Sequence, residues 1–236
     1  FMKAGGRLPG WVIGLSLFGT YLSSNTFIGV PGKAYAGNWN AFVFSLSIPI
    51  AIIIATRYFV KFYRDSGEIS AYEYLEKRFG LWARIYAVTC YLLTQVARCA
   101  TIMLGVAIGL QQVTGWNLTT IIGGIEAVIW TDAIQAVVLT VGALLVIGTL
   151  LVEHPEGASA AFAIAFDNDK FSLGSWKFGD LANSTVWVVL VFGLFINLTN
   201  FGIDQNYIQR YHAAENEAAA KRSLWIGALL YVPVSL

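Results

Sequence analysis

A series of apolar stretches, each long enough to cross a lipid bilayer, constrains this chain more than any other feature. A transmembrane helix takes about 20 residues, and the complete stretches meet that length. They are Pro9–Val30, Trp39–Val60, Leu81–Leu110, Ile125–Val152 and Ser184–Tyr207, and a further one starts near Leu224. Only 12% of the residues are charged, against about 25% in a soluble domain. The sequence therefore predicts an all-α integral membrane protein, with residues 1–236 forming one multi-pass domain in the cell membrane.

The residue patterns of several other functional classes are missing from the sequence. It has no G-x-G-x-x-G run and no P-loop, so a nucleotide-driven pump is not expected. No metal-ligand cluster and no nucleophile–base pair is evident, so we do not expect an enzyme. The net charge of +1 gives no reason to expect nucleic-acid binding, and no obligate protein partner is evident. The expected partners are the lipid bilayer and small solutes.

The first apolar stretch has a polar centre that does not suit a simple membrane anchor. Its helix-breaking and polar residues are Gly19, Thr20, Tyr21, Ser23, Ser24, Asn25 and Thr26. Backbone that leaves the helix inside a membrane survives only where it lines a protein cavity, and its freed carbonyls can bind a hard cation such as Na⁺. We therefore predict a broken helix here. The alternative is a continuous helix whose small polar residues form a packing face.

Ser184–Tyr207 has a similar pattern, with an apolar part followed by polar residues and a glycine. These are Asn197, Thr199, Asn200 and Gly202, which we expect to interrupt this helix as well. Two interrupted helices in corresponding positions of two halves are typical of transporters built from inverted repeats, with the binding site between the halves.

The charge of the loops indicates that one membrane crossing is unaccounted for. The loop of residues 57–84 is basic and the loop of residues 153–183 is acidic. Basic loops face the cytoplasm, yet the spans above would place the acidic loop inside as well. One additional helix before Ile125 corrects this, and residues 118–122 are too few to supply it. We expect a helix to be missing between Ile122 and Gly123. The alternative is that the charge bias misleads here.

Four charged residues lie within or near the spans, and two of them, Arg98 and Asp132, are candidates for function. Arg98 lies near the middle of its span, where a charge is costly, and it could pair with a substrate carboxylate or with a structural partner. Asp132 could attract Na⁺, accept a proton or act as an interfacial cap. Asp204 is expected to be a structural acid, and Lys33 a side chain that reaches back to the membrane surface.

Several motifs spread over the chain resemble those of the sodium:solute symporter family. They are G-G-R-L-P-G-W at 5–11, L-S-S-N-T-F-I-G at 22–29, K-A-Y at 33–35, S-A-Y-E-Y-L-E-K-R-F at 70–79, G-G-I-E-A-V-I-W-T-D-A-I-Q at 123–135 and Y-I-Q-R at 207–210. The resemblance implies a leucine-transporter-like bundle of five plus five inverted helices, of which this chain is a fragment. It implies an N-terminal helix and a C-terminal half that the chain lacks, and a complete helix before Gly123.

The resemblance also implies site residues. Sodium would be bound by backbone carbonyls of Gly19 and Leu22, with Asp132 nearby and hydroxyls from a helix beyond this chain. Within the family the sequence is most similar to bacterial sialic acid transporters. In these, the arginine matching Arg98 pairs with the substrate carboxylate. The positions that assist it match Tyr21, Ser23, Thr26 and Ser45.

Some of these positions depart from the family pattern. Tyr21 stands where the sialic acid transporters have a threonine, and Ser45 where they have a glutamine. The sodium/galactose branch has a sugar-binding glutamate at the position of Ser45, so it fits less well there. Asn197 matches a sugar-contacting asparagine of that branch, and Asn200 falls where that branch has a gating tyrosine.

From these residues we expect a Na⁺-coupled symporter that imports a small polar solute by alternating access. A carboxylate such as sialic acid is the favoured solute, and galactose or glucose is the alternative. Two other classes remain open at this point, a membrane sensor domain with a transporter fold and a passive channel or facilitator.

Overall fold

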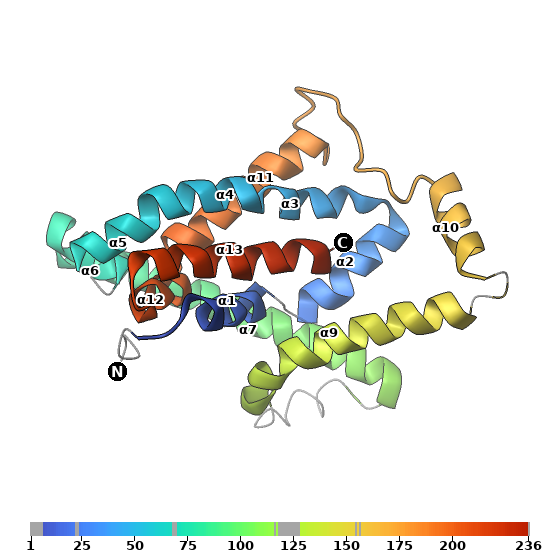
Figure 1. Cartoon of the computed structure of the whole chain (residues 1–236), viewed down its shortest axis with the longest axis horizontal. Coiled ribbons are helices and arrows are strands. Elements are labelled where there is room, and N and C mark those ends of the chain that lie inside the picture. Colours follow the sequence, from blue (N-terminus) through green and yellow to red (C-terminus); the bar gives the residue numbers. More distant parts are fainter. Residues whose placement is uncertain are drawn as a thin grey trace.

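The computed structural model describes residues 7–21, 24–67, 70–115, 117, 128–153, 155 and 157–235. Within these ranges the regular elements are helices (Figure 1). In chain order they are α1 (Gly10–Tyr21), α2 (Ser24–Ala36), the 3₁₀ segment η2 (Trp39–Phe42), α3 (Val43–Leu46), α4 (Ile48–Ile54), the π segment η3 (Ala55–Phe59), α5 (Val60–Ser66), α6 (Ala71–Phe79), α7 (Leu81–Thr114), α9 (Val128–Glu153), α10 (Ala158–Asp167), α11 (Val186–Gly202), α12 (Gln205–Ala213) and α13 (Glu217–Val234).

Helices cover most of the described residues in each stretch predicted from hydropathy. Two helical stretches, Trp39–Ser66 and Leu81–Gly105, are long and apolar enough to cross a membrane. Two bent helix pairs would each add a span if taken as one: Val141–Glu153 with Ala158–Asp167, bent by 98°, and Val186–Gly202 with Gln205–Ala213, bent by 52°. The helix expected between Ile122 and Gly123 falls outside the described residues.

The core centres on α1 and α13, which lie side by side and run in the same direction (Figure 1). Their backbones approach closely because glycines occupy the contact. A Cβ atom added to Gly14 would lie 2.8 Å from Cβ of Ile226, and one added to Gly227 would lie 2.6 Å from the carbonyl oxygen of Gly14. Small residues at helix contacts allow this kind of approach in membrane proteins.

A second close contact joins α11 to α3 and α4. Gly193 of α11 faces the residues where α3 meets α4, and a Cβ atom there would lie 2.7 Å from Oγ of Ser47. The fully buried apolar side chains around this contact and the α1–α13 pair include Ile48, Ile52, Phe201, Ile208, Tyr211 and Leu224. The core therefore holds α1, α4, α11, α12 and α13 together, and these helices position the candidate site.

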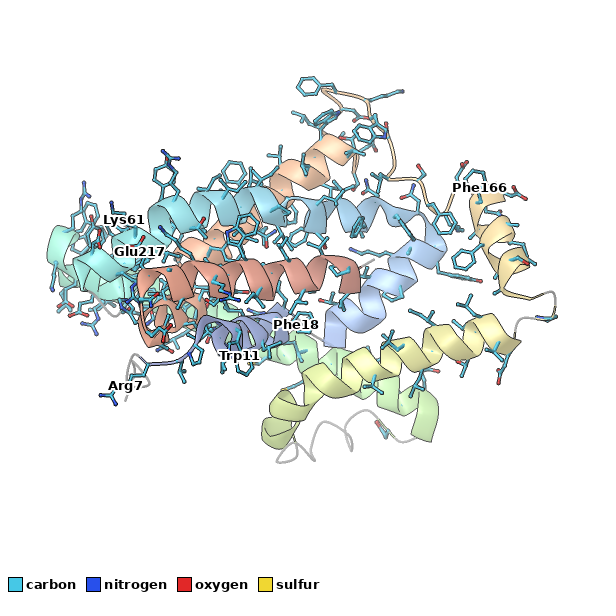
Figure 2. All side chains as sticks on the ribbon, in the orientation of Figure 1. Arg7, Trp11, Phe18, Lys61, Phe166 and Glu217 are labelled. Atoms are coloured by element: carbon cyan, nitrogen blue, oxygen red, sulfur yellow. The ribbon has the colours of Figure 1, made fainter. Side chains whose placement is uncertain are left out.

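The exterior of the bundle is strongly apolar. Trp11 on α1 and Phe166 on α10 have exposed fractions of 56% and 73%, and both project from the ribbon in Figure 2. The α7 stretch Leu81–Gly105 is apolar, yet its most hydrophobic part has no buried residue. Apolar surface on this scale suits contact with lipid or with further helices rather than with water.

Candidate functional site

A helix break lies near the centre of the described structure, between α11 and α12, with a bend of 52°. Residues 22–23, between α1 and α2, lie outside the described residues, so the interruption expected in the first span stays a prediction. Tyr21, at the end of the described part of α1, packs its ring against Phe201 of α11 and Tyr207 of α12 at centroid distances of 6.3 and 5.9 Å.

The predicted position of the break between α11 and α12 was wrong. The helix α11 continues through Asn197 and Thr199 as far as Gly202. The reason is that both polar side chains bond to carbonyls one turn earlier, Asn197 Nδ2 to Gly193 at 2.9 Å and Thr199 Oγ1 to Phe195 at 2.9 Å. Polar side chains can be satisfied in this way without leaving the helix.

The break itself falls at Ile203 and Asp204. The Asp204 carboxylate accepts a hydrogen bond from the backbone N–H of Asn206 at 2.8 Å and caps the N-terminus of α12. Such a cap satisfies a helix N–H group that has no partner within the helix. Asp204 is therefore the structural acid that the sequence predicted.

Asn197 lies at the centre of a buried chain of hydrogen-bonded side chains. Its side chain is fully buried, and its Nδ2 also donates to Oγ of Ser47 at 3.2 Å. The Tyr21 hydroxyl donates to Asn197 Oδ1 at 3.4 Å, and the Ser47 hydroxyl donates to the Phe44 carbonyl at 2.7 Å. Both amide N–H groups of Asn197 are thus in use, and α1, α11 and the junction of α3 and α4 are joined.

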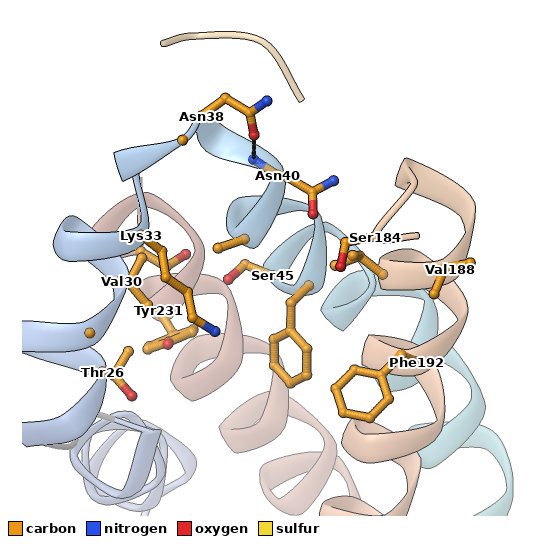
Figure 3. Close-up of a pocket in the computed structure, with 16 residues that line it drawn as sticks. Thr26, Val30, Lys33, Asn38, Asn40, Ser45, Ser184, Val188, Phe192 and Tyr231 are labelled. Carbon is orange, nitrogen blue, oxygen red and sulfur yellow. Dashed lines mark hydrogen bonds between the residues drawn. The ribbon is translucent and has the colours of Figure 1, made fainter. Parts of the chain in front are cut away.

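A pocket of about 850 Å³ lies beside this polar chain. It is bounded by α2, η2, α3, the first half of α11 and the end of α13 (Figure 3). Two of the predicted substrate residues, Thr26 and Ser45, line it. Tyr231 connects the pocket to Tyr21, because it lines the pocket and its ring stacks on the Tyr21 ring at 5.0 Å. We call this cavity the outer pocket, since the predicted topology places this end of α2 outside.

The other predicted residues lie elsewhere. Tyr21 and Asn197 belong to the polar chain just described and do not line the outer pocket. Asn200 is a partly exposed residue of α11, one turn beyond Asn197. Gly19 is in the last turn of α1. The positions of Leu22 and Ser23 lie outside the described residues, as does the side chain of Asp132, whose backbone lies near the start of α9.

Arg98 is separated from the outer pocket. It is an exposed residue of α7, and it makes no hydrogen bond or ion pair with another described side chain or backbone group. Thr94 and Thr101, which share its helix face, donate to carbonyls of their own helix, Cys90 at 2.8 Å and Ala97 at 2.6 Å. The helix α7 packs against α2. The structure thus brings Thr26 and Ser45 together but does not bring Arg98 to them.

Arg210 of α12 is a charged residue near α1 that was not among the predicted site residues. Its guanidinium donates to Ser16 Oγ at 3.1 Å and to Thr20 Oγ1 at 2.9 Å, both on α1, and to the Asn206 carbonyl at 2.7 Å. It therefore ties α12 to the last turn of α1, where Gly19 lies. The Y-I-Q-R motif at 207–210 includes this arginine, but in the sequence it indicated only the family resemblance and no role for Arg210.

Comparisons with known proteins agree with the family resemblance seen in the sequence. The model of the sodium:solute symporter family matches residues 1–234. The sodium/sialic acid symporter SiaT of Proteus mirabilis is 34% identical over 98% of this chain and 49% of its own length. The sodium-coupled monocarboxylate transporter 2 of Mus musculus is 29% identical over 97% of this chain and 39% of its own length. The chain spans about half the length of the curated relatives it matches, or less.

A solved structure has the same fold. It is a Na⁺-coupled sialic acid symporter in a substrate-bound, outward-open state, with a TM-score of 0.86 and 31% sequence identity. The match covers 100% of this chain and 53% of the other. It confirms the predicted all-helical, leucine-transporter-like bundle for the part of that fold which the chain spans.

Proposed function

The chain belongs to the sodium:solute symporter family, and on this premise we propose that it serves Na⁺-coupled import of a small organic carboxylate, with sialic acid as the first candidate. The observation that carries the proposal is the match to a substrate-bound Na⁺-coupled sialic acid symporter over the whole chain. The relatives described above are symporters of sialic acid and of monocarboxylates, solutes that share a carboxylate group. The cell membrane is the proposed location.

For sodium, we propose the end of α1 as the main ligand group. The last four carbonyls of a helix have no partner within it. Gly19 lies near the end of the described part of α1, where the sequence predicts that the helix is interrupted. Carbonyl oxygens at such broken helices coordinate Na⁺ in transporters of this type. Leu22 would supply a second carbonyl and Asp132 a nearby negative charge, both on the strength of the family resemblance.

For the substrate, we propose the outer pocket and the polar chain beside it. Thr26 and Ser45 would donate or accept hydrogen bonds within the pocket that they line. Roles for Tyr21, Ser23 and Asn200 rest on the resemblance. Arg98 as the carboxylate partner rests on the resemblance as well, and Asn197 is the weakest candidate because its amide N–H groups are already bonded.

Transport would follow from rocking of the two inverted repeats against each other. Na⁺ would stabilise the outward-facing arrangement, substrate would then bind, and both would be released inside. The membrane potential supplies about 2.3 kcal/mol per charge for each 100 mV. Residues 1–236 act as one transmembrane domain in this proposal, and the unassigned crossing between Ile122 and Gly123 completes its topology.

Uptake into proteoliposomes tests the proposal. Radiolabelled sialic acid and galactose are compared with and without an inward Na⁺ gradient. We expect sialic acid uptake to require the gradient and galactose uptake to stay at background. Na⁺-driven uptake of galactose alone would keep the coupling and refute the carboxylate. Equal uptake with and without Na⁺ would refute the coupled mechanism.

A further inference from the structure

The outer pocket contains one charged side chain among its described lining residues, and that side chain is Lys33. Figure 3 shows its ammonium pointing into the cavity, beside Tyr231. That Lys33 also reaches back to the membrane surface stays a prediction. A positive charge therefore faces the space that Thr26 and Ser45 also line.

A purely structural role for the Lys33 ammonium is already filled by another lysine. Lys33 lies in the last turn of α2, where a cation can bind the free carbonyls of the helix end. Lys170 does this instead, since its Nζ donates to the carbonyls of Tyr35 at 2.7 Å and Gly37 at 3.2 Å. Within the described part of the chain, the Lys33 ammonium has no hydrogen-bond or ion-pair partner.

The remaining lining of the outer pocket suits a small organic anion with polar substituents. Thr26 and Ser45 supply hydroxyl groups, and Phe44 and Phe192 supply apolar surface. The volume of about 850 Å³ is within the usual range for small-molecule sites, roughly 300–1,000 Å³. No carboxylate is present among the described lining residues to neutralise Lys33, so the charge of the pocket favours a negatively charged ligand.

We propose that the outer pocket is a carboxylate-binding site in which the ammonium of Lys33 takes the carboxylate of the arriving solute. This inference rests on the proposed function and adds a second cation, apart from Arg98, to its substrate site. Lys33 selects anions at the outer end of α2, and the role proposed for Arg98 on α7 belongs to a later contact.

Transport kinetics provide the first test. The variants are Lys33→Gln, which removes the charge, Lys33→Arg, which keeps it, and Lys177→Gln as a matched control in the exposed 168–185 loop. We expect Lys33→Gln to raise the KM for sialic acid about tenfold, a step that corresponds to about 1.4 kcal/mol, with kcat within about twofold. Lys33→Arg should restore the KM, and Lys177→Gln should leave it unchanged.

Chemical labelling of the wild-type protein provides a second test that does not depend on how a variant folds. An amine-reactive reagent modifies accessible lysines, and peptide mass spectrometry measures the labelled fraction of Lys33 and Lys177. Sialic acid should protect Lys33 and not Lys177. The methyl ester of sialic acid, which lacks the charge, should not protect Lys33 at the same concentration.

The outcomes separate this inference from the proposed function. An unchanged KM in Lys33→Gln, no protection by sialic acid, or equal protection by the ester would each overturn the role of Lys33. If the wild-type protein shows no Na⁺-driven uptake, the proposed function fails. The labelling result then still decides whether the pocket takes a carboxylate.

Discussion

Replacing Asn197 by alanine separates a structural role from a substrate-binding role at the buried centre of the site. The side chain is fully buried and bonds to three other groups, the Gly193 carbonyl, the Ser47 hydroxyl and the Tyr21 hydroxyl. Truncation removes all three hydrogen bonds at once. We expect a loss of stability, with little direct effect on the affinity for substrate.

The size of the loss follows from the geometry. Hydrogen bonds within membrane proteins contribute about 0.6 kcal/mol each on average, and the 3.4 Å contact with Tyr21 is the weakest of the three. The Ser47 hydroxyl keeps its bond to the Phe44 carbonyl, so only the Tyr21 hydroxyl loses its acceptor. The bonds then account for about 1.5 kcal/mol and the small cavity for about 1 kcal/mol more.

The assay is thermal unfolding of the purified protein in detergent, with and without sialic acid, together with the KM for uptake. Asn200→Ala is the matched control, because this asparagine lies on the same helix and makes no hydrogen bond to a described residue. We expect Asn197→Ala to lower the melting temperature by several degrees and Asn200→Ala to change it little. The increase caused by sialic acid should stay the same in Asn197→Ala.

The opposite pattern would refute this reasoning. If Asn197→Ala unfolds at the wild-type temperature but shows a raised KM, its amide contacts the substrate, as the sodium/galactose resemblance implied. The buried hydrogen bonds would then contribute nothing measurable to stability.

Two further predictions follow from the packing of α1. Arg210→Lys keeps the charge but loses the paired hydrogen bonds that the guanidinium makes to α1. The Na⁺ concentration for half-maximal uptake should therefore rise about fivefold, equivalent to about 1 kcal/mol. An unchanged Na⁺ dependence would contradict a link between α12 and the sodium site. Gly227→Ala should destabilise the protein by about 1–3 kcal/mol, because the new Cβ would lie 2.6 Å from the Gly14 carbonyl oxygen. Gly148→Ala is the control, and denaturant or thermal unfolding is the measurement. This variant should be neutral or slightly stabilising, since no described atom lies within 4 Å of the new Cβ. Equal losses of stability in both variants would refute the packing argument.

Local sequence determined the helical class and the approximate position of the apolar helices. These features depend on the length of apolar runs, which is a property of neighbouring residues. Motifs over most of the chain also identified the family, which the family model and the solved structure bear out.

Tertiary structure decided what individual polar residues do. Asn197 does not interrupt α11, because partners on the same helix and on Ser47 satisfy its amide, and no sequence pattern specifies a partner so distant in the chain. Lys33 lines the outer pocket, whereas Lys170, far along the sequence, bonds to a carbonyl at the end of α2. Hydropathy and charge locate such residues along the chain. Only the packing of separate helices determines which carbonyl, hydroxyl or cavity each one meets.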